Sequence, residues 1–248
     1  MRMSLPSSDD PRDRLCLVLD MLDRDELLAT ADELSEFFGY MKINFAFTLH
    51  GPELVARLKE RGVKVFLDLK LHDIPNTVAG YAQAVTRLGV ELVTFHTTGG
   101  VEMMRAAVTA GDATAAELGR PRPLFVGVTV LTSLDERQLQ AELGVVQPIS
   151  EVIRSRAALA AEAGLDGMVC APAELASIRD VVPDDFFFVT PGLRSVAGTD
   201  NDHKRTGTYR DALAGGSSLL VVGRDVLHSD NRVDAAKRVL AEVGEFQP

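Results

Sequence analysis

The segment FLDLKLHDIPNT, residues 66–77, combines acidic and basic side chains in a pattern typical of a β-strand followed by a loop. Alternate side chains of a strand share a face, so Asp68 and Lys70 point one way and the leucines beside them point the other. With a rise of about 3.3 Å per residue, their Cα atoms lie about 6.6 Å apart and their side chains can meet. Asp73 follows in the loop, and Pro75 suits the first turn of a helix. An ammonium held between carboxylates can stabilise a developing negative charge and then donate a proton.

Two further charged residues are expected on neighbouring strands, at the same height along the strands as this segment. Lys42 lies in the preceding apolar run, and Asp20 ends the run before that one. Buried charges must be paired, and an Asp68–Lys70 pair alone would satisfy that need as a structural salt bridge. Two lysines interleaved with the three carboxylates of Asp20, Asp68 and Asp73 instead predict a network for acid–base chemistry.

Other polar residues follow later apolar runs and suggest where an anionic ligand binds. Gly223 and Arg224 follow the last run, and a Pro-Gly-Leu-Arg sequence ending in Arg194 follows the one before it. Loops after the last two strands of a parallel barrel frequently bind phosphate through backbone N–H groups, and arginine can hold phosphate through two hydrogen bonds. Thr132 and Ser133 are expected to end the fifth apolar run, where they either cap the next segment or supply hydroxyls. His96 ends the fourth apolar run.

The elements that position these residues alternate along the whole chain. Apolar runs occur at 15–20, 40–45, 64–70, 92–97, 124–131, 167–171, 186–191 and 219–224, and amphipathic helical patterns at 23–38, 52–61, 76–88, 101–118, 150–163, 173–180, 208–214 and 232–243. Eight such units predict an α/β protein with a (β/α)8 TIM-barrel domain over residues 14–248, after a flexible tail over 1–13. An open doubly wound sheet is the alternative, but no Gly-x-Gly-x-x-Gly turn follows the first run. Carboxyl ends of barrel strands meet at one rim, and polar groups gathered there indicate an enzyme.

Composition restricts the class of protein further. The chain has 248 residues, 46% of them hydrophobic, and a formal net charge of −10, which disfavours nucleic acid and anionic membranes as partners. Two cysteines exclude a disulfide framework and fit a reducing cytoplasm. No signal peptide or membrane span is expected, so we predict a cytoplasmic protein. The histidines and cysteines show no metal-ligand spacing, and we predict no metal site.

Two connections are longer and more polar than the others. Residues 132–149 and 194–208 are expected to be loops, and long loops in compact domains often form lids over a site.

The ordered motifs resemble the orotidine 5′-phosphate decarboxylase family in its bacterial form. They are VLD at 18–20, Lys42, FLDLKLHDIPNT at 66–77, TVLTS at 129–133, TPGLR at 190–194 and VGR at 222–224, and the resemblance extends from about residue 14 to residue 244. It implies conversion of orotidine 5′-phosphate to UMP and carbon dioxide, the last step of de novo pyrimidine synthesis. It also implies a homodimeric barrel that uses neither a metal nor an organic cofactor.

The resemblance also implies roles for individual residues. Asp68, Lys70 and Asp73 would form the catalytic charged network, with Lys70 as proton donor to pyrimidine carbon 6, and Asp73 and Thr77 would cross a dimer interface. The substrate-binding residues would be Asp20 and Lys42 at the ribose, Thr132 and Ser133 at the pyrimidine, and Arg194, Gly223 and Arg224 at the phosphate. The family lid usually reads Gly-Asp-Gln-x-Arg, and here His203 stands where the glutamine that bridges base and phosphate is expected. Asp225 follows Arg224, where a proline is common.

Three other functions remain open at the level of sequence. A related sugar-phosphate decarboxylase, such as the 3-keto-gulonate 6-phosphate enzyme, shares the Asp-x-Lys-x-x-Asp pattern but uses magnesium. A class I aldolase would form a Schiff base on Lys70, although nearby carboxylates oppose the lowered lysine pKa that such chemistry requires. A barrel that binds a phosphorylated ligand without catalysis is the non-enzymatic alternative.

Overall fold

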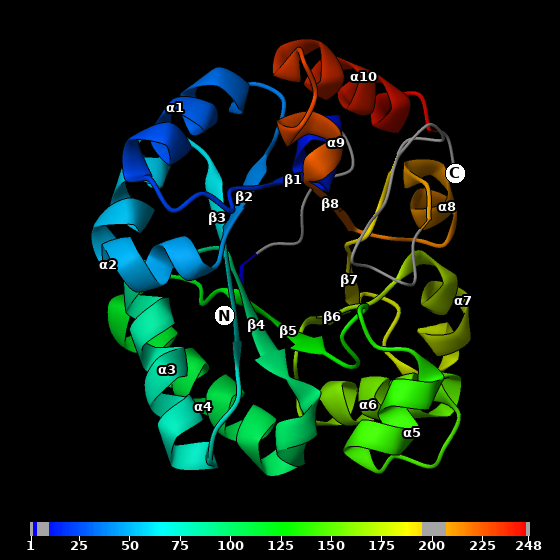
Figure 1. The fold of residues 1–248 in the computed structure, drawn as a ribbon. Coiled ribbons are helices and arrows are strands. Elements are labelled where there is room, and N and C mark those ends of the chain that lie inside the picture. The colour runs from blue at the N-terminus through cyan, green and yellow to red at the C-terminus, as the bar shows by residue number, and fades with distance from the viewer. Residues whose placement is uncertain (1, 4–9, 195–206, 247–248) are drawn as a thin grey trace.

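The computed structural model describes residues 2–3, 10–194 and 207–246, and its strands form a closed parallel barrel in sequence order. Figure 1 shows the strands at the centre with the helices around them. The strands are β1 (Leu15–Val18), β2 (Tyr40–Ile43), β3 (Lys64–Leu71), β4 (Leu92–His96), β5 (Leu124–Val128), β6 (Gly167–Val169), β7 (Phe187–Thr190) and β8 (Leu219–Val222). The predicted (β/α)8 barrel is confirmed.

Helices follow the strands and cover the outside of the barrel (Figure 1). The α-helices are α1 (Arg24–Leu34), α2 (Phe45–Lys59), α3 (Pro75–Leu88), α4 (Gly100–Leu118), α5 (Glu136–Leu143), α6 (Ile149–Glu162), α7 (Leu175–Ile178), α8 (Tyr209–Ala214), α9 (Arg224–Leu227) and α10 (Arg232–Gly244). Short 3-10 turns are η1 (Pro11–Arg14), η2 (Thr97–Gly99), η3 (Pro172–Glu174) and η4 (Arg179–Val181). Gly89 and Gly119, at φ 70° and 62°, end α3 and α4 in the left-handed conformation that favours glycine.

The hydrophobic core has two parts because alternate strand residues face opposite sides of the barrel wall. An inner cluster fills the barrel with side chains such as Phe66 and Val126. A larger outer cluster joins the strands to the helices and includes Val65, Leu67 and Leu71 of β3. The alternation predicted for this strand is therefore confirmed, and it leaves Asp68 and Lys70 above the inner cluster.

β3 departs from a regular strand at its carboxyl end. The β3–β4 register shifts between the pairs Leu67↔Val93 and Leu71↔Phe95, so four steps along β3 match two along β4. Lys70 lies inside this bulge at φ 50°, and among the described residues it is the only non-glycine with a positive φ. L-residues rarely adopt this conformation, and such strain is typically stored at functional sites.

Among the segments that differ from the prediction are one connection and one helix. The connection 132–149 was expected to be a loop but contains α5, whose first residues are stabilised by Asp135 and Gln138 in a reciprocal capping box. The helix expected at 52–61 begins earlier, as α2, and bends at Gly51, which has φ 60°.

The described part of the amino-terminal segment makes contacts with the barrel. Arg2 donates to Asp166 at 3.2 Å, and the N–H of Met3 donates to the carbonyl of Arg122 at 2.9 Å. Met3 also packs against the inner cluster. Arg122 is buried, forms an ion pair with Asp166, and lies just before β5, so these contacts close the amino end of the barrel.

In the part of the chain that the structure describes, no helix has the length and apolar character needed to cross a membrane.

Candidate active site

Two lysines converge on one buried carboxylate at the carboxyl end of the barrel. Lys42 of β2 and Lys70 of β3 place their Nζ atoms 3.3 Å and 2.8 Å from Oδ2 of Asp68. Asp20, two residues beyond β1, lies 3.8 Å from Lys42 Nζ. The structure therefore brings together four of the sequence-predicted residues, and adjacent strands β1, β2 and β3 position them.

The charges of this cluster stabilise one another despite burial. Burial acts to raise the pKa of Asp68, but Lys42 and Lys70 outweigh it and hold that pKa below its usual value. Burial likewise acts to lower the pKa of Lys42, and Asp68 with Asp20 raises it above the usual value. Both residues are 8% exposed, so they are ionised in a poorly hydrated environment where a neighbouring charge has a strong effect.

Thr94 of β4 completes the surroundings of Asp68, and it was not among the predicted site residues. Its hydroxyl donates to Oδ1 of Asp68 at 2.8 Å and accepts the backbone N–H of Lys70 at 2.9 Å. Thr94 is fully buried. A signal for it existed in the sequence, because Thr94 lies two residues before His96 and therefore shares its face of the strand.

His96 ends β4 as predicted, and it is accompanied by a second histidine. The ring of His72, in the loop after β3, has its centroid 5.6 Å from that of His96. Burial, followed by the nearby His72 and Lys70, lowers the pKa of His96, so its imidazole is neutral at pH 7. A neutral imidazole beside Lys70 adds no positive charge to the cluster.

Asp73 lies in the loop after β3, and Thr77 lies in the helix that follows it. Asp73 is exposed, and its carboxylate accepts the N–H of Ile74 at 2.6 Å, just before α3. No hydrogen bond or ion pair links Asp73 to Lys70 within the described residues. Thr77 is half-buried in the first turn of α3. Next to them Ile74 is 66% exposed and Tyr81 is 45% exposed.

The hydroxyl pair Thr132–Ser133 does not end strand β5 as predicted. β5 ends at Val128, so both residues belong to the turn that precedes α5 rather than to the end of a strand. Thr132 is half-buried and Ser133 is exposed. The turn forms because the N–H of Leu134 donates to the carbonyl of Leu131 at 2.9 Å.

The residues predicted for phosphate follow β7 and β8. The N–H of Arg194 donates to the carbonyl of Gly207 at 3.1 Å, which holds together the two ends of the connection between β7 and α8. Gly223 separates β8 from α9, and Arg224 is the exposed first residue of α9. His203 lies outside the described residues.

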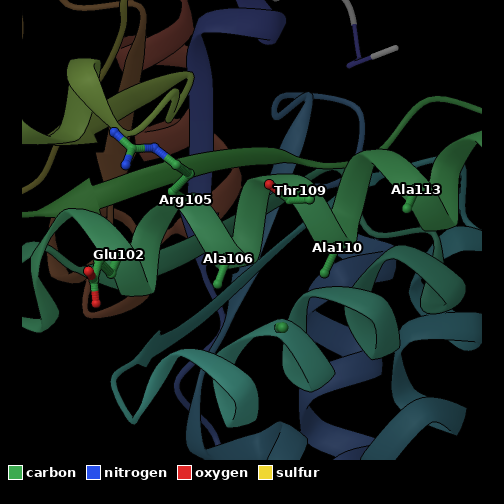
Figure 2. A pocket seen from close by; sticks show the side chains of 7 residues that line it. Glu102, Arg105, Ala106, Thr109, Ala110 and Ala113 are labelled. Atoms are coloured by element: carbon green, nitrogen blue, oxygen red, sulfur yellow. The ribbon is translucent and has the colours of Figure 1, made fainter.

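A separate hollow of about 470 Å³ lies along α3 and α4, away from the lysine–aspartate cluster. Figure 2 shows Ala106, Ala110 and Ala113 along α4, with Glu102 and Arg105 toward one end. Small side chains and few polar groups make this surface poor at orienting a small ligand, so the charged cluster is the better candidate for chemistry.

Within the described ranges, no three His, Cys, Asp or Glu side chains are grouped so that they could hold a metal ion. The ionic groups of the site are instead the two ammoniums and two carboxylates of Lys42, Lys70, Asp20 and Asp68.

A closed parallel barrel with a buried ionic network at its carboxyl-end rim belongs to the class of (β/α)8 barrel enzymes. Comparison with known proteins defines the group within that class. The chain belongs to the orotidine 5′-phosphate decarboxylase / HUMPS family, whose model matches residues 13–239.

Individual relatives are similar to this chain over nearly its full length. Orotidine 5′-phosphate decarboxylase of Moorella thermoacetica is 42% identical over 233 residues, covering 94% of this chain and 92% of the relative. Among solved structures, orotidine 5′-phosphate decarboxylase of Lactobacillus acidophilus is 30% identical with a TM-score of 0.81, covering 94% of this chain and 99% of that one. An uncharacterized conserved protein of Geobacillus kaustophilus is 36% identical with a TM-score of 0.77, covering 93% and 100%. The resemblance found in the motifs is confirmed.

Proposed function

We propose that this protein converts orotidine 5′-phosphate to UMP and carbon dioxide, the last step of pyrimidine nucleotide synthesis. The observation that carries the proposal is the Lys70 ammonium, 2.8 Å from a buried carboxylate at the catalytic rim of a barrel of this family. The relatives named above support the substrate, because they are named for this reaction.

The reaction requires a cation close to a carbon that becomes negative. When the bond from carbon 6 to the carboxylate breaks, carbon dioxide leaves and the electron pair stays on carbon 6, outside the π-system of the ring. Lys70 stabilises that charge electrostatically and then transfers one proton to carbon 6, giving UMP. The neutral amine regains a proton from water, so atoms and charge balance without a metal or an organic cofactor.

Asp68 has two effects in this mechanism. Its Oδ2 lies 2.8 Å from Lys70 Nζ, so the carboxylate pairs with the ammonium and holds it at the rim of the barrel. It also lies near the expected position of the substrate carboxylate, and two like charges at about 4 Å repel by about 4 kcal/mol at an effective dielectric constant of 20. The most effective enzymes lower barriers by more than about 20 kcal/mol, so stabilisation of the carbanion must supply most of the effect.

The remaining predicted residues would bind the rest of the nucleotide. Asp20 and Lys42 lie beside Asp68 and are suited to the ribose hydroxyls, and Thr132 with Ser133 would contact the base. Arg194, Gly223 and Arg224 follow the last two strands, where barrels frequently bind phosphate. His203 would contribute from the connection after β7 as the counterpart of the family's glutamine.

A homodimer is part of this proposal, with Asp73 and Thr77 entering the partner's site. Exposed Ile74 and Tyr81 beside these residues, together with the hollow along α3 and α4, form an apolar surface of the kind that protein interfaces cover. An Asp73 supplied by the partner would give the Lys70 ammonium a second carboxylate. We also place the enzyme in the cytoplasm, where pyrimidine nucleotides are made.

The direct test is the decrease in ultraviolet absorbance of orotidine 5′-phosphate when chelator-treated protein is added. Turnover that persists in EDTA supports the proposal, whereas turnover restored only by magnesium favours the sugar-phosphate decarboxylase. No turnover, together with tight UMP binding, would identify a non-catalytic barrel. Borohydride trapping of a carbonyl substrate on Lys70 would identify an aldolase.

A further inference from the structure

The bulge in β3 leaves backbone groups without their usual strand partners. Between Leu67 and Leu71 the β3–β4 ladder is interrupted, and Lys70 occupies a left-handed conformation at this interruption. A buried N–H group without an acceptor is costly, so a bulge of this kind needs a replacement for the lost ladder bond. The side chain of Thr94 provides it by accepting the N–H of Lys70 at 2.9 Å.

The same hydroxyl also fixes the carboxylate on which the lysines converge. It donates its single proton to Oδ1 of Asp68 at 2.8 Å, and Oδ2 of Asp68 then faces both ammoniums. A hydroxyl has one donor and two acceptor positions, so it can make both bonds at once. Thr94 therefore links the main chain of Lys70 to the side chain of Asp68 through one buried oxygen atom.

We propose that Thr94 is a positioning residue of this active site, whose hydroxyl sets where Asp68 and the Lys70 ammonium stand relative to each other. The inference rests on the proposed function and extends it to a residue of β4 that has no direct part in the chemistry. Thr94 is fully buried. It acts through Lys70 and Asp68, because preorganised charges stabilise a transition state only when neighbouring groups hold them in place.

A matched pair of variants isolates the hydroxyl. Thr94→Val keeps the branched shape of the side chain but removes the oxygen, and Thr94→Ser keeps the oxygen but removes a methyl group. Hydrogen bonds to charged groups contribute factors of about 10 to 100, so Thr94→Val should lower kcat by about 10- to 100-fold. Its KM should change by less than about twofold, because the hydroxyl contacts groups of the protein rather than the substrate. The kcat and KM of Thr94→Ser should stay close to those of the parent protein.

A second measurement does not depend on turnover. Carbon-13 NMR of aspartate-labelled protein, with Asp68→Asn to assign the signal, follows the titration of the Asp68 carboxyl. The charged or titratable groups around it are Lys42 of β2, Lys70 of β3, His96 of β4, Cys16 of β1 and Asp20 beyond β1. Both Thr94 variants retain all of these groups. The carboxyl should therefore titrate at higher pH in Thr94→Val, which lacks a hydrogen bond to the charged form, and at the parental pH in Thr94→Ser.

The outcomes separate this inference from the proposed function. An inactive parent would refute the decarboxylase, while the NMR titration would still decide whether the hydroxyl controls Asp68. An active parent with equal kcat and equal Asp68 titration in Thr94→Val would refute the positioning role. Equal losses in the valine and serine variants would show that the site responds to any change in this side chain rather than to loss of the hydroxyl, and would also overturn the inference. Circular dichroism establishes that both variants are folded.

Discussion

Replacing Asp68 by asparagine should destabilise the fold much more than replacing Asp20 by asparagine. Asp68 Oδ2 lies 3.3 Å from Lys42 Nζ and 2.8 Å from Lys70 Nζ. At an effective dielectric constant of about 20, unit charges at these distances attract by about 5 and about 6 kcal/mol. Solvent screens the second attraction, because the Lys70 side chain is 31% exposed, whereas that of Lys42 is only 10% exposed.

Most of the loss should come from the Lys42 ammonium, which stays buried after its nearest carboxylate is removed. Breaking a buried ion pair on one side costs about 3–5 kcal/mol in the free energy of unfolding. Asp20 is the matched control, because it lies 3.8 Å from the same ammonium but is 44% exposed. Ion pairs with an exposed partner contribute about 1 kcal/mol or less. Urea unfolding of the parent and both variants at pH 7 measures the two losses.

The dependence on pH gives an independent check. The pKa of Asp68 in the folded protein is below its usual value, so its stabilising contribution is present above the unfolded pKa and is lost as pH falls through the folded one. The pKa of Lys42 is raised, so its contribution is present below the unfolded pKa and is lost as pH rises through the folded one. The difference in the free energy of unfolding between the parent and Asp68→Asn should therefore become smaller as the pH is lowered. A difference in unfolding free energy that does not change with pH would refute this reasoning. Equal losses of unfolding free energy in the Asp68 and Asp20 variants would also refute it.

Three further substitutions test other parts of the molecule. Lys70→Ala should abolish the decarboxylation of orotidine 5′-phosphate while circular dichroism stays unchanged; appreciable residual turnover would remove Lys70 from its proposed role. Arg224→Ala should weaken binding of UMP by at least about tenfold more than binding of uridine, as expected for a charged hydrogen bond to phosphate, and equal losses in calorimetry would contradict the phosphate assignment. Gly167→Ala should lower the thermal midpoint, because a Cβ at Gly167 would lie 2.0 Å from the carbonyl oxygen of Phe187, and overpacking costs about 1–3 kcal/mol; an unchanged midpoint would show that the β6–β7 contact can relax.

Much of the fold could be predicted because its signals are local. Apolar runs alternate with helical patterns, and glycines such as Gly89 and Gly119 occur where helices end in the left-handed conformation. α5 was missed although its capping residues Asp135 and Gln138 are visible in the sequence, because a short and strongly polar segment resembles a loop. For this helix, the capping residues at its start indicate the structure better than the overall polarity of the segment does.

The site was predictable only in part because its geometry depends on an irregular strand. Strand periodicity placed Asp68 and Lys70 on one face, and parallel order brought Lys42 beside them. The bulge that turns Lys70 to φ 50° has no signature in the sequence, since lysine is not a residue that favours this conformation. Thr94 shares a strand face with His96, but its hydrogen-bond partners become apparent only when the register of β3 against β4 is known.

The closed amino end of the barrel has a consequence for how the molecule tolerates change. Arg122 forms ion pairs with Asp112 and Asp166, and Asp166 also accepts the N–H of Phe125. These contacts stabilise the amino end of the barrel, opposite the end that carries the lysines. These residues lie away from the lysines, whereas Asp68 and Lys42 at the carboxyl end of the barrel contribute both to stability and to the proposed chemistry. Stability can therefore be changed at the amino end of the barrel without altering the reacting groups, whereas a change in the ionic network at the carboxyl end affects both stability and reactivity.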